Sequence, residues 1–198
     1  MVPSSKSHTN LGNGIWYFHV RAKDNAGYWG AADHYRVQIF NPGWVSPTGY
    51  DDPKGEWNDE PYAYDENTNT KAYSNRYYIQ QWTKFLVLTL PSPIRSNKIR
   101  FWAWYDADHC DQIDVDIYSN DAWVDVYQGS YAGYTWVEKT FSERSVTKAR
   151  VAFHVIKGTW AYVVADLHEF DFYQSNHFLG LGEFMSPLDL LLKQANLL

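Results

Sequence analysis

Apolar and polar residues alternate with period two along much of the chain, which is the pattern of strands that bury one face. This pattern predicts strands at 85–90, 98–104, 112–118, 122–127, 135–141, 148–155 and 167–173. On three of them the apolar side chains share one face: Ile99, Phe101 and Ala103, then Ile113, Val115 and Ile117, then Ala149, Val151 and Phe153. No segment before residue 186 has a helical period long enough to compete, so the sequence predicts an all-β antiparallel sandwich or jelly roll.

A separate hairpin is predicted near the N-terminus. Residues 15–22 and 34–39 both alternate, and "KDNAG" follows the first run with turn chemistry. The stretch "NPGWVSP" interrupts both periodicities, so we predict a boundary there, with one segment at 1–41 and a second domain at 46–174. The remaining tail, 175–198, carries the start signals of a short helix at Ser186 and Pro187.

Composition narrows the function classes. Aromatic residues make up 18% of the chain, with 10 Trp and 16 Tyr, so some must lie on the surface, where they suit sugars and protein partners. The net charge of −6, without a basic stripe, disfavours nucleic-acid binding. No apolar run approaches the roughly 20 residues of a membrane span. Cys110 is the single cysteine and rules out an internal disulfide, and the polar first ten residues indicate either a cytoplasmic protein or a piece of a longer one.

The stretch "AYDENTNT", residues 63–70, concentrates carboxylates, amides and hydroxyls. One explanation is a polar turn held by Asx hydrogen bonds, although a turn needs fewer such residues. The other is a calcium ion, which collects about six to eight oxygen ligands. Both explanations remain open from these residues alone.

The segment "LGNGIWYFHVRAKDNAGYWG" resembles the last two strands of a fibronectin type III domain. Trp16 stands where that family usually has a corner tyrosine. The resemblance covers about 35 residues of a fold that needs about 100, and it implies that the chain is the C-terminal part of a larger multidomain protein.

Residues 46–173 resemble the discoidin-like family of galactose-binding-like jelly rolls, which includes coagulation-factor C domains and many bacterial carbohydrate-binding modules. "AYDENTNT", "FLVLTL" and "LHEFDFY" carry the resemblance. It implies a structural calcium site, with carboxylates from Asp65 and Glu169, the hydroxyl of Thr70, and backbone carbonyls of Ala63 and Asn67. Many relatives have glycine after the aspartate, where this chain has a glutamate.

The resemblance also implies sugar binding by loops at one end of the sandwich, through aromatic platforms and a few polar side chains. The positions that we expect to contribute are Trp57, Tyr62, Arg76, Tyr78, Trp82, Trp104, Tyr105, His109 and Trp160. Alternation with Phe101 and Ala103 further predicts that Trp102 and Trp104 face away from the core.

No catalytic motif surrounds a nucleophile, and "DADHCD", residues 106–111, lacks a second His/Cys pair at zinc spacing. The sequence therefore predicts a noncatalytic carbohydrate-binding or adhesion module of a larger extracellular or cell-surface protein, beside neighbouring domains of that protein. The alternative is a structural or assembly protein of a surface layer, filament or viral fibre, which binds a protein partner. An accessory domain of a polysaccharide-degrading enzyme is a third reading.

Overall fold

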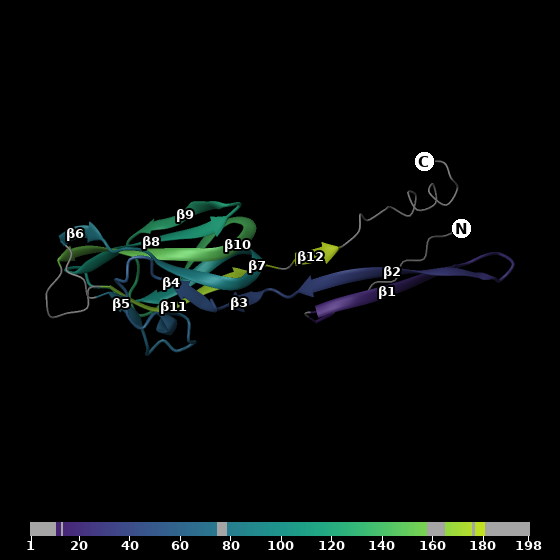
Figure 1. Cartoon of the computed structure of the whole chain (residues 1–198), viewed down its shortest axis with the longest axis horizontal. Coiled ribbons are helices and arrows are strands. Elements are labelled where there is room, and N and C mark those ends of the chain that lie inside the picture. Colours follow the sequence, from purple (N-terminus) through teal and green to yellow (C-terminus); the bar gives the residue numbers. More distant parts are fainter. Residues whose placement is uncertain (1–10, 13, 75–78, 158–164, 176, 181–198) are drawn as a thin grey trace. The chain divides into compact units, whose positions relative to one another are not determined.

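The computed structural model describes residues 11–12, 14–74, 79–157, 165–175 and 177–180, and the chain divides into two units (Figure 1). Unit 1 combines Met1–Asn41 with Asn176–Leu198, and unit 2 is Pro42–Ser175. The short helix predicted in the tail lies outside the described residues.

Unit 1 contains a three-stranded antiparallel sheet in the order β1-β2-β12. Its strands are β1 (Gly14–Lys23), β2 (Trp29–Phe40) and β12 (His177–Gly180). The first two form the predicted hairpin, and the fibronectin type III assignment stays a prediction. Asp24 closes the turn, because its carboxylate accepts a 2.8 Å hydrogen bond from the N–H of Tyr28, and Gly27 adopts φ 93.

Unit 2 is built almost entirely from strands. Its described elements are β3 (Gly43–Val45), β4 (Gly49–Asp51), the 3-10 helix η1 (Glu60–Ala63), β5 (Ala72–Ser74), β6 (Ile79–Trp82), β7 (Leu86–Ala103), β8 (Cys110–Ser119), β9 (Ala122–Gly129), β10 (Trp136–Lys157) and β11 (Ala165–Gln174). The main hydrogen-bonded order is β3-β11-β7-β10-β8-β9.

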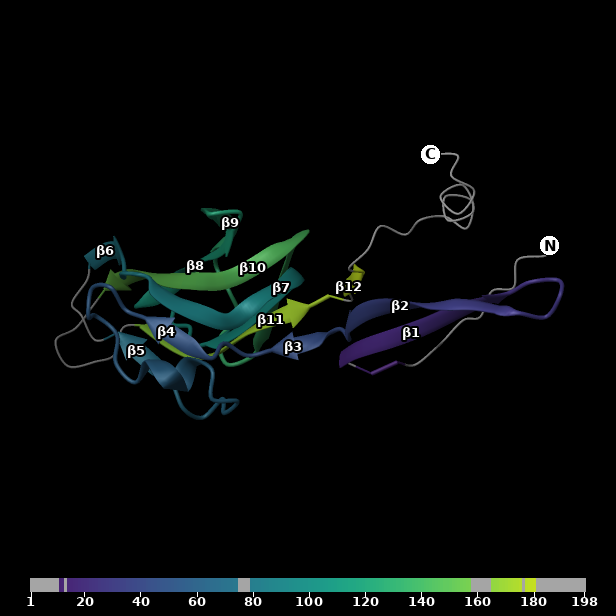
Figure 2. The same cartoon turned by 45° about the vertical axis from the view of Figure 1, so that its right-hand side comes forward.

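Two long strands, β7 and β10, run through both layers of the sandwich (Figure 2). The C-terminal part of β7, residues 96–103, lies between β10 on one side and β11 on the other. The C-terminal part of β10, residues 148–155, pairs with β8. The expectation of separate strands at 85–90 and 98–104, and likewise at 135–141 and 148–155, is therefore wrong. Each pair is one continuous strand, because the chain crosses between layers through register shifts rather than through a turn.

The core lies between the layers and is formed by the residues that alternation predicted. Each of the nine side chains listed above for the shared faces of β7, β8 and β10 is fully buried. Phe170 and Phe172 of β11 extend the cluster beside Phe101 and Ile99, their register partners on β7. The predicted all-β sandwich is confirmed, and its stability rests on this apolar burial.

The intervening residues of β7 and β11 form an outer face on the β3-β11-β7-β10 layer. Arg100 pairs in register with Asp171, and Trp102 with Glu169. Trp136 of β10 lies opposite Trp102 on its other side, with their rings 5.9 Å apart. Aromatic and charged side chains therefore meet on this face. Within the described ranges, the structure holds no helix with the length and apolar character needed to cross a membrane.

Candidate functional site

The oxygen-rich loop of residues 65–70 lies against Glu169 of β11. The backbone N–H of Asn67 donates a 2.7 Å hydrogen bond to Glu169 Oε1. The Thr70 hydroxyl lies 2.9 and 2.8 Å from the two Asp65 carboxylate oxygens and 2.7 Å from the Asn67 carbonyl oxygen. Two segments far apart in sequence thus bring carboxylate, hydroxyl and carbonyl oxygens together.

A β-bulge at His168 helps to place Glu169 beneath this loop. The register of β11 against β7 shifts at His168, and the ring Nδ1 lies 3.0 Å from the carbonyl oxygen of Thr68, to which it donates. At the end of the loop, Lys71 Nζ lies 2.5 Å from the buried carboxylate of Asp166. The loop is therefore fastened to β11 at several points, and it covers the polar residues there.

Glu169 is only 2% exposed, which makes its charge costly. Burial, together with the neighbouring Asp65 and Asp171 carboxyl groups, raises the pKa of Glu169 from 4.5 to about 8. Among the described residues, no lysine or arginine forms an ion pair with Glu169. Near neutral pH the Glu169 carboxyl group is therefore mostly protonated in the metal-free protein, and a bound cation would favour its charged form.

The donor set fits a hard cation such as calcium, because Asp65, Asn67, Thr70 and Glu169 all offer oxygen. Ala63, the fifth predicted ligand, ends η1 with a buried side chain, and no hydrogen bond within the described residues ties its carbonyl to the cluster. Calcium at this place stays a prediction that the geometry permits.

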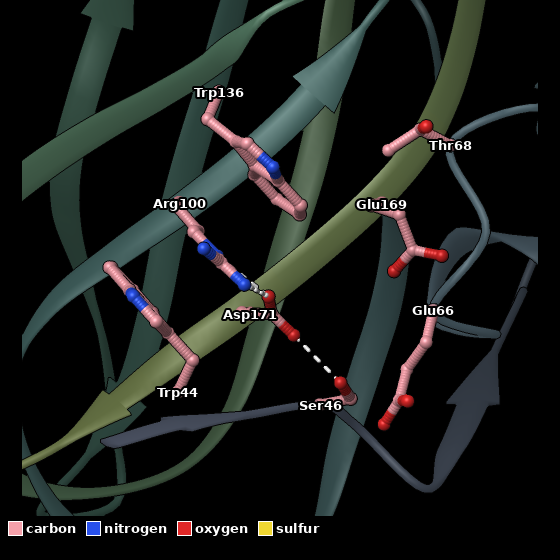
Figure 3. Close-up of a pocket in the computed structure, with 8 residues that line it drawn as sticks. All are labelled: Trp44, Ser46, Glu66, Thr68, Arg100, Trp136, Glu169 and Asp171. Atoms are coloured by element: carbon pink, nitrogen blue, oxygen red, sulfur yellow. Dashed lines mark hydrogen bonds and ion pairs between the residues drawn. The ribbon is translucent and has the colours of Figure 1, made fainter. Parts of the chain in front are cut away.

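Glu66 has the left-handed backbone conformation that the glycine of many relatives would favour, with φ 63. Such a conformation costs a non-glycine residue on the order of 1 kcal/mol. Figure 3 shows its carboxylate directed toward Ser46 and away from the carboxylate of Glu169. The glutamate thus keeps the loop geometry and points its charge into the space beside the loop.

That space is a pocket of about 230 Å³ on the outer face (Figure 3). Its lining comes from β3 and the residue that follows it, from β7, β10 and β11, and from the loop: Trp44, Ser46, Glu66, Thr68, Arg100, Trp136, Glu169 and Asp171. The pocket therefore adjoins the oxygen cluster directly and shares Glu169 with it.

Arg100 is held between two tryptophans beside this pocket. Its guanidinium carbon lies 4.4 Å from the Trp44 ring centroid and 3.9 Å from that of Trp136. Nε and Nη2 donate to Asp171 Oδ2 at 2.8 and 2.7 Å, and Ser46 Oγ donates to the other Asp171 oxygen at 2.7 Å. Stacking and ion pairing together fix this group in one orientation.

The predicted ligand position at Trp57 is wrong, because its side chain belongs to the core. Only 4% of Trp57 is exposed, and its indole N–H donates to the Lys84 carbonyl at 2.9 Å. Tyr62 lies in η1 and is 44% exposed. Trp82 is half-buried against His154, with ring centroids 5.3 Å apart. The structure does not bring these side chains into one site.

Trp102 faces outward as expected, whereas the outward orientation predicted for Trp104 is wrong. Since β7 ends at Ala103, Trp104 no longer follows the alternation, and it packs against the core together with Tyr105. His109 is held by Asp106, with 3.0 Å between His109 Nδ1 and the carboxylate. Three further candidates lie outside the described residues: Arg76, Tyr78 and Trp160.

Sequence reasoning missed Trp44, Trp136, Arg100 and Asp171 as site residues. A signal was present, since alternation leaves Arg100 on the outer face of one predicted strand and Asp171 on that of another. What the sequence does not show is that these strands are neighbours, which depends on the pairing order.

A second acidic group lies on the other layer, where carboxylate oxygens of Asp114, Asp116 and Asp125 are within 4.8 Å of one another. Arg150 compensates Asp116 through two contacts of 2.7 Å. Burial, then Asp116 and Asp125, raise the pKa of Asp114 to about 6. Arginine pairing thus relieves part of this repulsion, and proton uptake by Asp114 relieves more of it below about pH 6.

No protein-family model matches this chain, and no curated protein matches it significantly. Solved structures do match. A family 32 carbohydrate-binding module from a family 31 glycoside hydrolase of Clostridium perfringens is 11% identical, with TM-score 0.50, over 65% of this chain and 96% of that one. A chitosan-binding module of a chitosanase/glucanase from Paenibacillus sp. IK-5 is 20% identical, with TM-score 0.46, over 67% and 93%. The family 32 module of NanJ from C. perfringens, solved with galactose, is 14% identical, with TM-score 0.44, over 68% and 93%. The first likeness confirms the jelly-roll β-sandwich.

Proposed function

We propose that unit 2 is a noncatalytic carbohydrate-binding module of a larger extracellular or cell-surface protein. The observation that carries this proposal is the outer-face pocket, where tryptophan rings stand beside fixed hydrogen-bonding groups. The neighbour with the same fold is a carbohydrate-binding module of a glycoside hydrolase, which supports the proposal by analogy only.

The pocket has the chemistry that a sugar ring requires. The parts of the Trp44 and Trp136 rings that Arg100 does not cover offer apolar surface to a pyranose, while Ser46, Thr68 and Arg100 offer hydrogen bonds to its hydroxyl groups. A volume of about 230 Å³ is below the roughly 300–1,000 Å³ of sites for drug-sized ligands, and it suits a single sugar ring of a longer chain. Because Arg100 is already held in place, little side-chain ordering opposes binding.

We further propose that a calcium ion binds the oxygen cluster and acts as a structural staple. Asp65, Thr70, Glu169 and the Asn67 carbonyl would hold it, and the Ala63 carbonyl is the remaining candidate ligand. When bound, the ion supplies positive charge that compensates the buried carboxylates. It thereby fastens the loop that forms one wall of the pocket.

A glycan array followed by calorimetry tests sugar binding. We expect the calcium-loaded protein to bind at least one oligosaccharide, and Trp136→Ala to abolish that binding. The matched control is Trp123→Ala, because Trp123 stacks on Arg150 at 4.6 Å on the other layer, as Trp136 stacks on Arg100. Binding that survives Trp136→Ala, or that is lost equally in both variants, contradicts the proposed site.

A second candidate function, assembly with a protein partner, is favoured by the exposed aromatics of unit 1. Tyr17, Tyr28 and Trp29 are 62%, 74% and 57% exposed. Within the described residues β1 pairs with β2 alone, so its other edge can accept a strand. Light scattering after size exclusion tests this function: concentration-dependent assembly that Tyr17→Ser and Trp29→Ser abolish would favour it, and a monomer at all concentrations would oppose it.

A further inference from the structure

The hairpin of unit 1 places two histidines directly opposite each other. His19 of β1 and His34 of β2 are register partners, within a run of pairs that continues without a shift from Gly14 to Arg21. Their Nδ1 atoms lie 2.6 Å apart, and their ring planes are almost perpendicular. Both residues are exposed. Strand pairing therefore directs two ring nitrogens toward each other on an open surface.

The separation of 2.6 Å between these two imidazole nitrogens shows that they share one hydrogen. A neutral imidazole ring carries one N–H and one acceptor nitrogen, so one ring donates and the other accepts. Neutral imidazole nitrogens are also the commonest metal ligands in proteins. A metal ion that binds both Nδ1 atoms competes with the shared hydrogen, which moves through solvent to Nε2 of its own ring.

The spacing of the two nitrogens indicates which kind of ion fits between them. At metal–nitrogen bonds of about 2.0–2.1 Å, two ligand nitrogens lie about 2.9 Å apart across a right angle and about 3.3 Å apart across a tetrahedral angle. The pair must therefore open by about 0.3 Å for a right-angled site, but by about 0.7 Å for a tetrahedral one. Right-angled nitrogen ligands are typical of tetragonal Cu(II) and Ni(II), and Cu(II) binds such ligands more tightly.

Two positively charged side chains share this face of the hairpin with the histidines. Arg21 is directed toward the turn, because its Nε donates to the Gly30 carbonyl at 3.2 Å and its guanidinium carbon lies 5.5 Å from the Trp29 ring centroid. Arg36 pairs in register with Tyr17, next to the histidine pair. These charges lower the affinity of the face for a cation, and added salt screens them.

We propose that His19 and His34 form a chelating site for Cu(II) on unit 1, with water in the remaining coordination positions of the ion. The site is independent of the carbohydrate-binding function proposed for unit 2. A bound ion links β1 to β2 through side chains, in addition to their backbone pairing. Because the ion binds the folded hairpin, it stabilises unit 1 by mass action.

Electron paramagnetic resonance of the full chain with substoichiometric Cu(II), at neutral pH, tests the proposal. We expect one ion per chain and a signal split by two imidazole nitrogens. In His19→Gln and in His34→Gln the signal should lose one nitrogen, and the affinity for Cu(II) should fall at least about tenfold, since even supporting residues of metal sites contribute that much. The control His109→Gln should keep both, because it removes an imidazole of unit 2 that is paired with Asp106.

Both histidines of the pair are exposed, so the metal-free variants should keep the melting temperature of the wild type. The affinity for Cu(II) should rise with added salt and fall at lower pH, where protons compete for the nitrogens. A signal that is the same in the wild type and in both variants of the pair overturns the proposal. Copper-dependent dimerisation with one ion per two chains also overturns it, because the ion then bridges two copies. Neither result bears on sugar binding by unit 2.

Discussion

Replacing Glu169 by glutamine is expected to separate the electrostatic cost of this buried carboxyl group from its role in metal binding. Glutamine keeps the size of the side chain and an acceptor for the Asn67 N–H, but it cannot ionise. In the metal-free folded protein the pKa of Glu169 is raised from 4.5 to about 8, mainly by burial. The folded state therefore holds a proton that the unfolded chain has already lost at neutral pH.

The direction and size of the effect of Glu169→Gln on stability follow from this difference in pKa between the folded and unfolded states. Stability from Glu169 is fully present below pH 4.5 and is lost as the pH rises toward about 8. At pH 7 the loss spans about 2.5 pH units at about 1.4 kcal/mol each, or about 3.5 kcal/mol. In chelator, Glu169→Gln should therefore be more stable than the wild type by up to about 3.5 kcal/mol at pH 7, or roughly 7–14 °C in melting temperature.

Calcium should reverse the order of stability, so that the wild type becomes more stable than Glu169→Gln. An ion that binds only the folded state raises the wild-type melting temperature with concentration, whereas the variant lacks the ligand and should respond weakly. The assay is thermal unfolding of both proteins at pH 5, 7 and 8.5, in chelator and in a calcium series. Equal calcium responses, or a metal-free variant less stable than the wild type at every pH, would refute the reasoning.

Three further outcomes follow from particular side chains. Trp57→Ala should destabilise unit 2 by about 3–5 kcal/mol in urea unfolding, because it empties a core position; a change near zero would contradict its burial. Asp114→Asn should remove the part of the stability loss that occurs between pH 3.8 and about 6, as followed by unfolding across that range in calcium; an unchanged pH profile would contradict the raised pKa of Asp114. Trp104→Ala should lower the melting temperature while leaving sugar affinity within about twofold in calorimetry, and a full loss of binding would move the site to the loop end.

The fold could be predicted where local pattern and global packing agree. Alternation marked Ile99, Phe101 and Ala103 as core, because a half-buried strand has period two and these positions face the opposite layer. The prediction that Asp65 and Glu169 lie close together came from the family resemblance, because no local sequence pattern links these two positions.

The pocket could not be predicted, because it is assembled by strand pairing between distant segments. Trp44 stood in a stretch that sequence reasoning treated as a linker, and Trp136 in an ordinary strand. Only the order β3-β11-β7-β10 brings both rings to Arg100. The prediction that Trp104 faces outward is wrong for a related reason. The strand β7 ends one residue before it, and tertiary contacts decide where a strand ends.

The most direct measurement is a crystal structure of the calcium-loaded protein with the oligosaccharide that binds it most tightly. We expect a sugar ring against Trp136 and within hydrogen-bonding distance of Arg100 or Ser46. A sugar bound only at the loop end of unit 2, or a crystal in saturating oligosaccharide whose outer-face pocket holds no sugar, would contradict the proposed site.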